Sequence, residues 1–167
     1  MRAIALMTLL TLAATLHGQA PSRAGSVDEI NKLPVDTVSI SLSSPSNGMF
    51  EACARFAKLE RLASSSRKHT ADDVGLGHIA KLTTLIELDL YGCDRYTDAG
   101  IEKLAALTNL TELELKGGTF TDAAVSKLAV LSKLEKLDLS SNPKLTGVCF
   151  ADFKADCLLD GIKLNEC

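Results

Sequence analysis

Carboxylate side chains recur in the middle of this 167-residue chain at spacings that could gather them on one surface. Glu87 and Asp89 are two residues apart, Glu112 and Glu114 repeat that pair, and Asp138 follows. Residues two apart point to the same side of an extended strand. A surface that collects these carboxylates could bind a basic protein segment, bind a metal ion, or simply keep a sheet hydrated.

Metal binding and catalysis are not what these patterns predict. The carboxylate spacing does not enclose an ion with the roughly six to eight oxygens that Ca²⁺ takes. His69 and His78 lack the His-Glu-x-x-His zinc frame, and Gly75-x-Gly77 is expected inside a helix, where packing explains it better than phosphate binding. The sequence therefore predicts no catalytic residue, no metal and no cofactor, so the chain is not expected to be an enzyme. The alternative from that class is an enzyme with an unrecognised site.

A repeated leucine phrase would position the carboxylates. Leu-x-x-Leu-x-Leu alternates apolar and polar residues, as a half-buried strand does. Weaker copies of the phrase begin at Val35, Leu59 and Leu159, and six copies start 24 to 26 residues apart. The three strong copies are Leu85-Leu88-Leu90, Leu110-Leu113-Leu115 and Leu134-Leu137-Leu139. A period of this length indicates a repeat architecture rather than an ordinary globule.

Helical spacing separates successive strand phrases. In TDAGIEKLAAL, Thr97 can cap a helix, and Ile101, Leu104 and Leu107 form an apolar stripe. TDAAVSKLAVL repeats the pattern from Thr121. Each repeat is therefore expected to contain one strand and one short helix.

The segment LDLYGCDRYTDAGIEKLAAL resembles the cysteine-containing class of leucine-rich repeats, with related Thr-Asp-Ala-Gly motifs. The Asn/Cys slot of that class is occupied by Cys93, Gly118, Asn142 and Cys167. The resemblance covers roughly residues 35–167. It implies an α/β leucine-rich-repeat solenoid, with a short curved parallel sheet of about six strands and helices on the convex side. It also implies protein recognition as the usual role.

Residues between the leucines should face solvent on the concave side. Reading across the strands gives one column of Arg61, Glu87, Glu112 and Lys136, and a second of Ala63, Asp89, Glu114, Asp138 and Lys163. Two interpretations remain open: an acidic strip that receives a basic protein surface, or carboxylates that only hydrate the sheet while lysines soften their repulsion. The candidate partner-binding residues are Glu87, Asp89, Tyr91, Glu112, Glu114, Lys116, Lys136 and Asp138.

The first twenty residues have a different composition. Arg2 precedes an apolar run from Ala3 to Leu16, and Gly18-x-Ala20 supplies the small residues of a cleavage site, which predicts a signal peptide over residues 1–20. An uncleaved membrane anchor and a buried first helix are the alternatives. Residues 21–34 are interpreted as a linker and an N-terminal capping helix, and residues 35–167 as the repeat domain. The mature chain is then expected to be secreted or to lie in the periplasm or cell envelope, without stable membrane insertion.

Charge limits the class of partner. The formal net charge of −3 argues against nucleic-acid binding, which needs a basic surface. The predicted function is therefore that of a non-enzymatic module for protein–protein interaction, with an unknown protein partner that has a basic surface. A structural envelope-associated repeat protein is the alternative.

Cysteine positions and the chain's last strand leave two points open. Cys53 and Cys93 are expected to be small buried residues, with Cys93 able to bond the turn backbone. One disulfide is expected among Cys149, Cys157 and Cys167, in an unspecified combination. The strand edge from Leu159 to Leu164 could support self-association, because an uncovered edge offers unpaired backbone groups.

Overall fold

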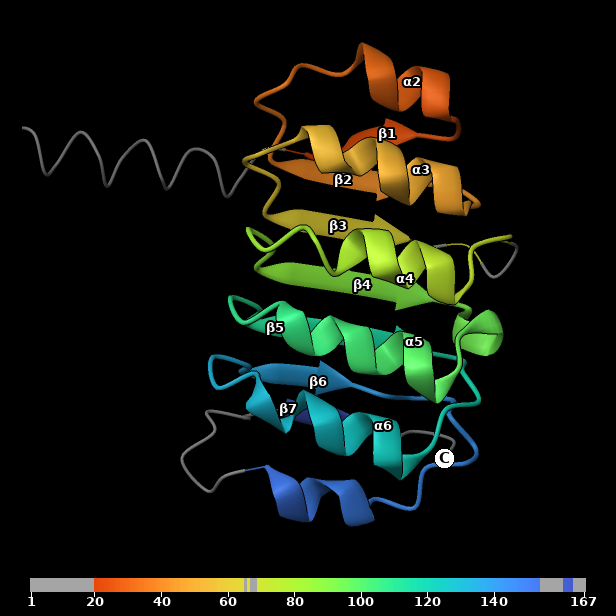
Figure 1. Cartoon of the computed structure of the whole chain (residues 1–167), viewed down its shortest axis with the longest axis vertical. Coiled ribbons are helices and arrows are strands. Elements are labelled where there is room, and N and C mark those ends of the chain that lie inside the picture. The colour runs from red at the N-terminus through yellow and green to blue at the C-terminus, as the bar shows by residue number, and fades with distance from the viewer. Residues whose placement is uncertain (1–19, 65, 67–68, 154–160, 164–167) are drawn as a thin grey trace, which may run out of the picture.

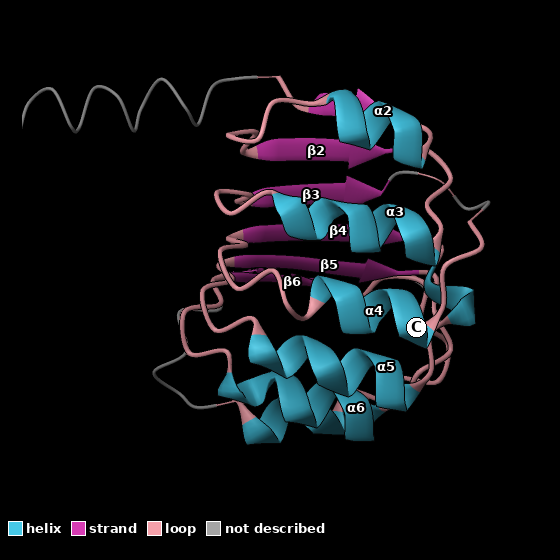
Figure 2. Cartoon of the chain, turned by 45° about the horizontal axis from the view of Figure 1, so that its top comes forward, coloured by secondary structure: helices cyan, strands magenta, loops and turns pink. Residues whose placement is uncertain are grey.

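Strands and helices alternate along the chain and form two layers (Figure 1). The computed structural model describes residues 20–64, 66, 69–153 and 161–163. The strands lie side by side in one sheet, and the helices cover its convex face (Figure 2). This is the predicted α/β solenoid.

One sheet contains all the strands of the described residues, in chain order and all parallel. It has 7 strands, one more than the sequence suggests, because residues of the expected linker add a strand at its N-terminal edge. The predicted sixth strand is present around Ile162, whereas Leu159 and Leu164 lie outside the described residues. The strands are β1 (Ser22–Ala24), β2 (Ser39–Leu42), β3 (Arg61–Ser64), β4 (Glu87–Tyr91), β5 (Glu112–Lys116), β6 (Lys136–Asp138) and β7 (Gly161–Lys163).

The helices are short, and most are extended or replaced by a 3₁₀ turn. The α-helices are α2 (Val27–Lys32), α3 (Asn47–Ala52), α4 (Asp73–Ile79), α5 (Asp98–Lys103) and α6 (Asp122–Lys127). The 3₁₀ turns are η1 (Cys53–Arg55), η2 (Cys93–Arg95), η3 (Leu104–Ala106), η4 (Leu128–Val130) and η5 (Val148–Asp152). Helices of this length are not stable alone, so packing against their neighbours must hold them.

The core consists of stacked columns of equivalent leucines. Leu62 pairs with Leu88, Leu88 with Leu113, and Leu113 with Leu137 across successive strands. Each of these four side chains is at most 1% exposed. The leucines of the repeated phrase therefore form one buried column, and every repeat completes the core of the one before it.

The N-terminal helix α2 begins with a side-chain cap. Ser26 Oγ accepts a hydrogen bond of 3.2 Å from the Glu29 amide. The Glu29 carboxylate bonds back to the amide of Gly25, at 2.6 Å, rather than to that of Ser26. This exchange fixes the turn between β1 and α2.

Aspartates at the starts of α4, α5 and α6 form hydrogen bonds to the next repeat. The sequence predicts that Thr97 caps its own helix, but its side chain makes no such bond. Instead its amide and hydroxyl donate to the carboxylate of Asp73, one repeat earlier, at 2.9 and 2.5 Å. Thr121 bonds Asp98 in the same way, at 2.7 and 2.6 Å. The Thr-Asp motif therefore joins repeats to one another in a ladder.

A glycine makes room for this ladder. A Cβ atom on Gly100 would lie 2.0 Å from Asp73 Oδ1, which is closer than atoms can approach. Asp73 could then no longer reach Thr97. Gly100 is thus explained by a contact with the preceding repeat.

The turn after each strand contains the Asn/Cys slot. Cys93 Sγ donates to the Leu90 carbonyl oxygen at 3.2 Å, as predicted. Asn142, which is 0% exposed, donates from Nδ2 to the carbonyl oxygens of Leu115 and Leu139 at 2.7 and 2.6 Å. Its Oδ1 accepts from the Gly118 amide at 2.7 Å. Asn142 therefore satisfies backbone groups of two adjacent repeats.

Three cysteines of the described residues are free and buried: Cys53, Cys93 and Cys149. Burial raises the pKa of Cys53 to about 12. Burial, with a hydrogen bond to Asp122, raises the pKa of Cys149 to about 12. These thiols therefore stay protonated and pack as small apolar groups. Cys157 and Cys167, the other members of the expected disulfide set, lie outside the described residues.

Candidate functional site

All eight candidate residues lie on one face of three neighbouring strands. In the register of the sheet, Glu87 stands opposite Glu112, and Asp89 stands opposite Glu114. The next strand continues these columns with Lys136 and Asp138. Tyr91 pairs with Lys116 at the end of β4 and β5. The predicted columns are confirmed as geometry, and they bring the carboxylates within one strand spacing of each other.

Two lysines neutralise part of this surface. Lys116 Nζ lies 2.5 Å from Glu114 Oε2 and 3.0 Å from Asp138 Oδ2. Lys136 Nζ lies 2.5 Å from Glu112 Oε1, and this hydrogen bond raises the pKa of Lys136. Three carboxylates of the concave face therefore have a cation beside them.

Asp138 differs from the other candidates because it is buried, at 7% exposure. Its Oδ1 accepts hydrogen bonds from the Ser140 amide and hydroxyl at 3.0 and 2.6 Å. Desolvation favours the neutral acid, but the bonds from Ser140 and Lys116 outweigh it and lower the pKa of Asp138. This carboxylate stabilises the end of β6, and little of it is open to a partner.

Asp89 is a carboxylate of the face whose pKa rises on folding. Within the described part of the chain, no group donates a hydrogen bond to Asp89 or forms an ion pair with it. Desolvation and the nearby charges of Glu114 and Asp138 raise its pKa to about 6, while Lys116 acts in the opposite direction. Ionised Asp89 is therefore unfavourable for folding.

Replacing Asp89 with asparagine should stabilise the chain at neutral pH. A carboxyl whose pKa is raised on folding contributes stability that is lost as pH rises, here between about 4 and about 6. Asp89→Asn removes that loss, so urea denaturation should show a gain of about 1 kcal/mol near pH 7.5, after allowance for solvent screening. The gain should disappear below about pH 4.

Glu112→Gln is the matched control for this prediction. Glu112 lies in the same face but has Lys136 beside it, so losing its charge removes an ion pair. It should not stabilise the chain near neutral pH. An equal gain in both variants would contradict the special environment assigned to Asp89.

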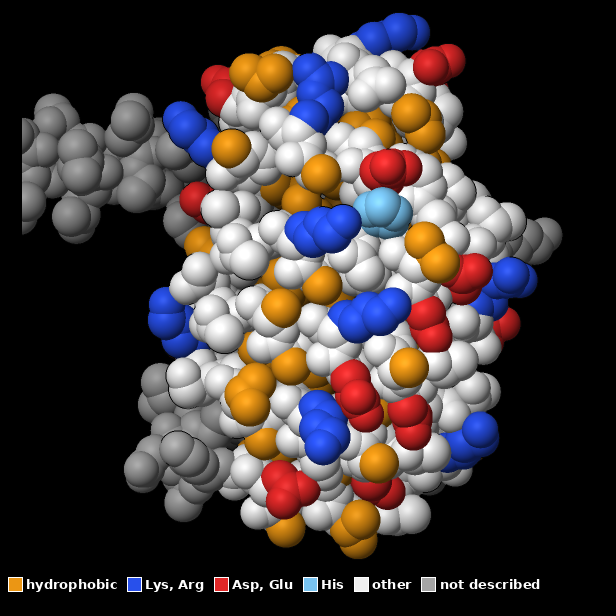
Figure 3. Space-filling view, in the orientation of Figure 1, with side chains coloured by type: hydrophobic (Ala, Val, Ile, Leu, Met, Phe, Trp, Pro, Cys, Tyr) orange, Lys and Arg blue, Asp and Glu red, His pale blue; other side chains and the backbone are white. Residues whose placement is uncertain are grey.

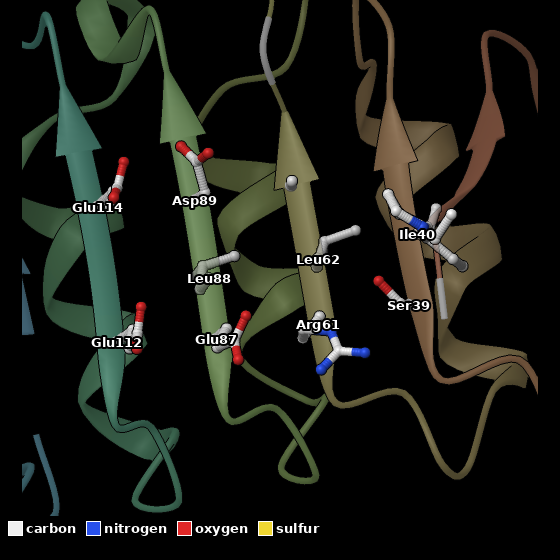
Figure 4. Close-up of a pocket in the computed structure, with 12 residues that line it drawn as sticks. Ser39, Ile40, Arg61, Leu62, Glu87, Leu88, Asp89, Glu112 and Glu114 are labelled. Carbon is white, nitrogen blue, oxygen red and sulfur yellow. The ribbon is translucent and has the colours of Figure 1, made fainter. Parts of the chain in front are cut away.

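The concave face contains a hollow of about 510 Å³ beside these carboxylates (Figure 4). It spans the face from the residues just before β1 to β5. Figure 4 shows the carboxylates of Glu87 and Asp89 on β4, with Arg61 on β3 between Glu87 and Ser39. The lining residues are Ala20, Pro21, Ser39, Ile40, Arg61, Leu62, Ala63, Glu87, Leu88, Asp89, Glu112 and Glu114.

The residues that line the N-terminal half of this hollow are not among the contact residues predicted from the sequence. Ser39 on β2 and Ala63 on β3 are small, and Ala63 stands next to Asp89 of the acidic strand β4. The sequence places Ala63 correctly in the column of Asp89. Because the alanine side chain is short, it leaves open space on the concave face beside Asp89. The change from a small residue to acidic ones along the column of Ala63, Asp89 and Glu114 is the sequence pattern from which the hollow could have been predicted.

The helical side of the molecule has a different charge pattern. Figure 3 shows Lys and Arg side chains interspersed with Asp and Glu over the helices. Glu102 and Lys103, for example, are neighbouring exposed residues on α5. The concave face is therefore the one where carboxylates gather in register.

Metal and membrane sites do not emerge from the described residues. They contain no group of three or more His, Cys, Asp or Glu that could hold a metal ion. Among them, no helix has the length and apolar character needed to cross a bilayer. Residues 1–19 of the predicted signal peptide lie outside the described part of the chain.

Two features considered for catalysis have packing roles. His69 is buried, its Nε2 contacts the carbonyl oxygen of Gly92, and its ring stacks on Tyr96 with centroids 5.4 Å apart. A Cβ atom on Gly75 would lie 2.6 Å from Asn47 Oδ1, so this glycine allows two repeats to approach. The absence of enzymatic activity stays a prediction.

Comparisons with known proteins agree with this architecture. A family model described as Leucine Rich repeat matches residues 106–129, which include β5 and α6. A chain from the crystal structure of a TLR13–ssRNA13 complex is similar in fold, with a TM-score of 0.58 and 21% sequence identity. The match covers 81% of this chain and 20% of that chain, so the chain spans only about a fifth of the longer protein. The comparison with curated proteins gave no match. Residues 106–129 therefore match a leucine-rich repeat in sequence, and the described residues have the fold of a leucine-rich-repeat solenoid.

Proposed function

We propose that this chain is an exported, non-enzymatic module that binds a basic protein surface on its concave face. The leucine-rich-repeat fold suggests protein–protein interaction as the general type of function. Fold alone does not select a partner, so the proposal for this chain rests on the chemistry of its face.

The observation that carries the proposal is the environment of Asp89. Folding places this carboxylate opposite Glu114, within reach of Asp138, and without a hydrogen-bond donor or cation of its own among the described residues. Such an arrangement lowers stability, and binding sites are where proteins retain groups of this kind. A partner's cation would supply the missing charge.

Protein is favoured over nucleic acid as the partner. Phosphates would be repelled by the carboxylates of β4 and β5, and the net charge of −3 adds to that repulsion. The similar solved structure is a complex of TLR13 with ssRNA13, and that ligand belongs to TLR13 only. For this chain, single-stranded RNA is a negative control in the binding experiment below.

Binding of an extended lysine-rich peptide tests the proposal. The double variant Glu87→Gln/Asp89→Asn should bind the peptide at least about tenfold more weakly, because it removes two charges that face the ligand. Added salt should weaken binding to the parent chain. Isothermal titration calorimetry measures both effects.

A double variant outside the hollow, with the same change in charge, serves as the control. Asp94→Asn/Glu102→Gln alters two exposed residues that do not line the hollow, and it should bind as the parent does. Equal losses in both double variants would show an effect of net charge only. Failure of the parent chain to bind the peptide would contradict the proposed function itself.

The ion pairs favour a second candidate, a structural envelope-associated repeat protein. Lys116 and Lys136 already neutralise Glu112, Glu114 and Asp138, as a hydrated sheet without a partner would require. Such a protein would bind no lysine-rich peptide through this face. Self-association through the β7 edge is a further expectation of the sequence, and light scattering over a range of concentrations would detect it.

Export is proposed from residues 1–20, whose apolar run and small residues before Pro21 are typical of a signal peptide. The protein would then work outside the cytoplasm, in the periplasm or cell envelope or as a secreted chain. The enzyme alternative has no supporting observation.

A further inference from the structure

The hollow on the concave face arises from a change in side-chain size along the sheet. On β2 and β3 the outward residues include Ser39 and Ala63, whereas β4 and β5 present Asp89 and Glu114 at the level of Ala63. Ala63 is only partly buried, and it stands directly opposite Asp89 in the register. Space is therefore available above Ala63, and the hollow extends from there past Asp89 to Glu114.

The lining of the hollow has two chemical characters. Ala63 within the sheet and Pro21 beside its N-terminal edge are apolar residues of the lining, whereas Ile40, Leu62 and Leu88 border it from the core and are each 1% exposed. Carboxylates come from β4 and β5, with Asp89 and Glu114 in one column and Glu87 in the other. An occupant must therefore offer an apolar surface to one part and positive charge to another.

We infer that this hollow accepts one lysine side chain of the basic partner, with its methylene stem beside Ala63 and its ammonium group at Asp89. The inference rests on the proposed function and specifies where a single side chain enters. A lysine has this dual character, since its stem packs against apolar surface while its head stays charged.

Lysine fits the carboxylates better than arginine does. The carboxylates of Asp89 and Glu114 belong to adjacent strands, about 4.8 Å apart. A compact ammonium group with three donors can contact carboxylates from two strands, whereas a planar guanidinium group is best matched to one carboxylate in a two-bond arrangement.

Filling the hollow tests the inference without changing any charge. Ala63→Leu should weaken binding of the lysine-rich peptide about tenfold, because the new side chain occupies the space for the stem. Ala99→Leu makes the same substitution at an exposed position on α5 and should bind as the parent does. Thermal unfolding of both variants establishes that the binding loss does not come from loss of the fold.

Shortening the ligand tests the same point on the unaltered protein. A peptide in which diaminobutyric acid replaces every lysine keeps the ammonium groups at pH 7 but loses two of the four methylenes of each stem. It should bind about tenfold more weakly than the lysine peptide, and an arginine version should also bind more weakly. These ligands keep the inference testable even where Ala63→Leu disturbs the sheet.

The outcomes separate this inference from the proposed function. Suppose that Glu87→Gln/Asp89→Asn abolishes binding while Ala63→Leu and stem shortening leave it unchanged. In that case the face binds basic ligands through charge alone, and the inference that the hollow accepts a lysine side chain is wrong. An arginine peptide that binds as well as the lysine peptide would overturn the choice of ammonium.

Discussion

Leu113→Ala should destabilise the chain by about 2–5 kcal/mol, measured by chemical denaturation. Leu113 is 0% exposed and stands in the column between Leu88 and Leu137, so the cavity would open in the middle of the shared core. Short parallel strands on both sides restrict the collapse that could refill it. A loss of this size is a large part of the stability of a small domain.

Lys127→Ala is the comparison for that variant. Lys127 is exposed at the end of α6, and alanine is a good helix former, so the change should alter stability by less than about 0.5 kcal/mol. The stacked core would be refuted if the stability of Leu113→Ala lay within about 1 kcal/mol of that of the parent chain.

Asn142→Ala should cost about 3 kcal/mol or more. The asparagine amide is fully buried, and its loss leaves the carbonyl oxygens of Leu115 and Leu139 and the amide of Gly118 without the partner they have now. Each unsatisfied buried backbone group costs about 1–3 kcal/mol, although relaxation of the turn offsets part of the sum. Urea denaturation monitored by circular dichroism measures the difference.

Asn109→Ala provides an asparagine control in an exposed turn. Asn109 Nδ2 donates to the Thr83 carbonyl oxygen at 2.9 Å, and its Oδ1 accepts from Lys133 at 2.7 Å, but water can replace both bonds. Its loss should cost less than about 1 kcal/mol. Similar costs for the two asparagines would remove the structural role given to Asn142.

The leucine columns and the strand register could be predicted because they depend on spacing alone. A repeat of 24 to 26 residues brings Leu88 beside Leu113, and alternation along a strand then places Asp89 beside Glu114. The same argument could not find β1, because Ser22–Ala24 contains no leucine, and Ala24 alone of its residues is buried in the core.

Side-chain hydrogen bonds and ion pairs between repeats could not be predicted from the sequence. Thr97 matches a helix cap by type, yet its bonds go to Asp73 in the previous repeat, which no local pattern indicates. Asp138 has the spacing of an open carboxylate, but Ser140 and Lys116 lie beside it in the fold. The hollow exists because Ala63 has no side-chain atoms beyond Cβ. Its extent depends on the residues of the neighbouring strands that line it.

The aspartate ladder has a consequence for how such a repeat array can gain repeats by duplication. Each carboxylate bonds one repeat ahead, as Asp98 bonds Thr121, so a tandem duplication of a Thr-Asp repeat would supply acceptor and donor together. Gly147 occupies the next aspartate position, where its amide donates to Asp122 Oδ1 at 3.0 Å, and it has no side-chain carboxylate. Gene duplication within the array would therefore preserve every link, whereas growth beyond Gly147 would first require a new acid there.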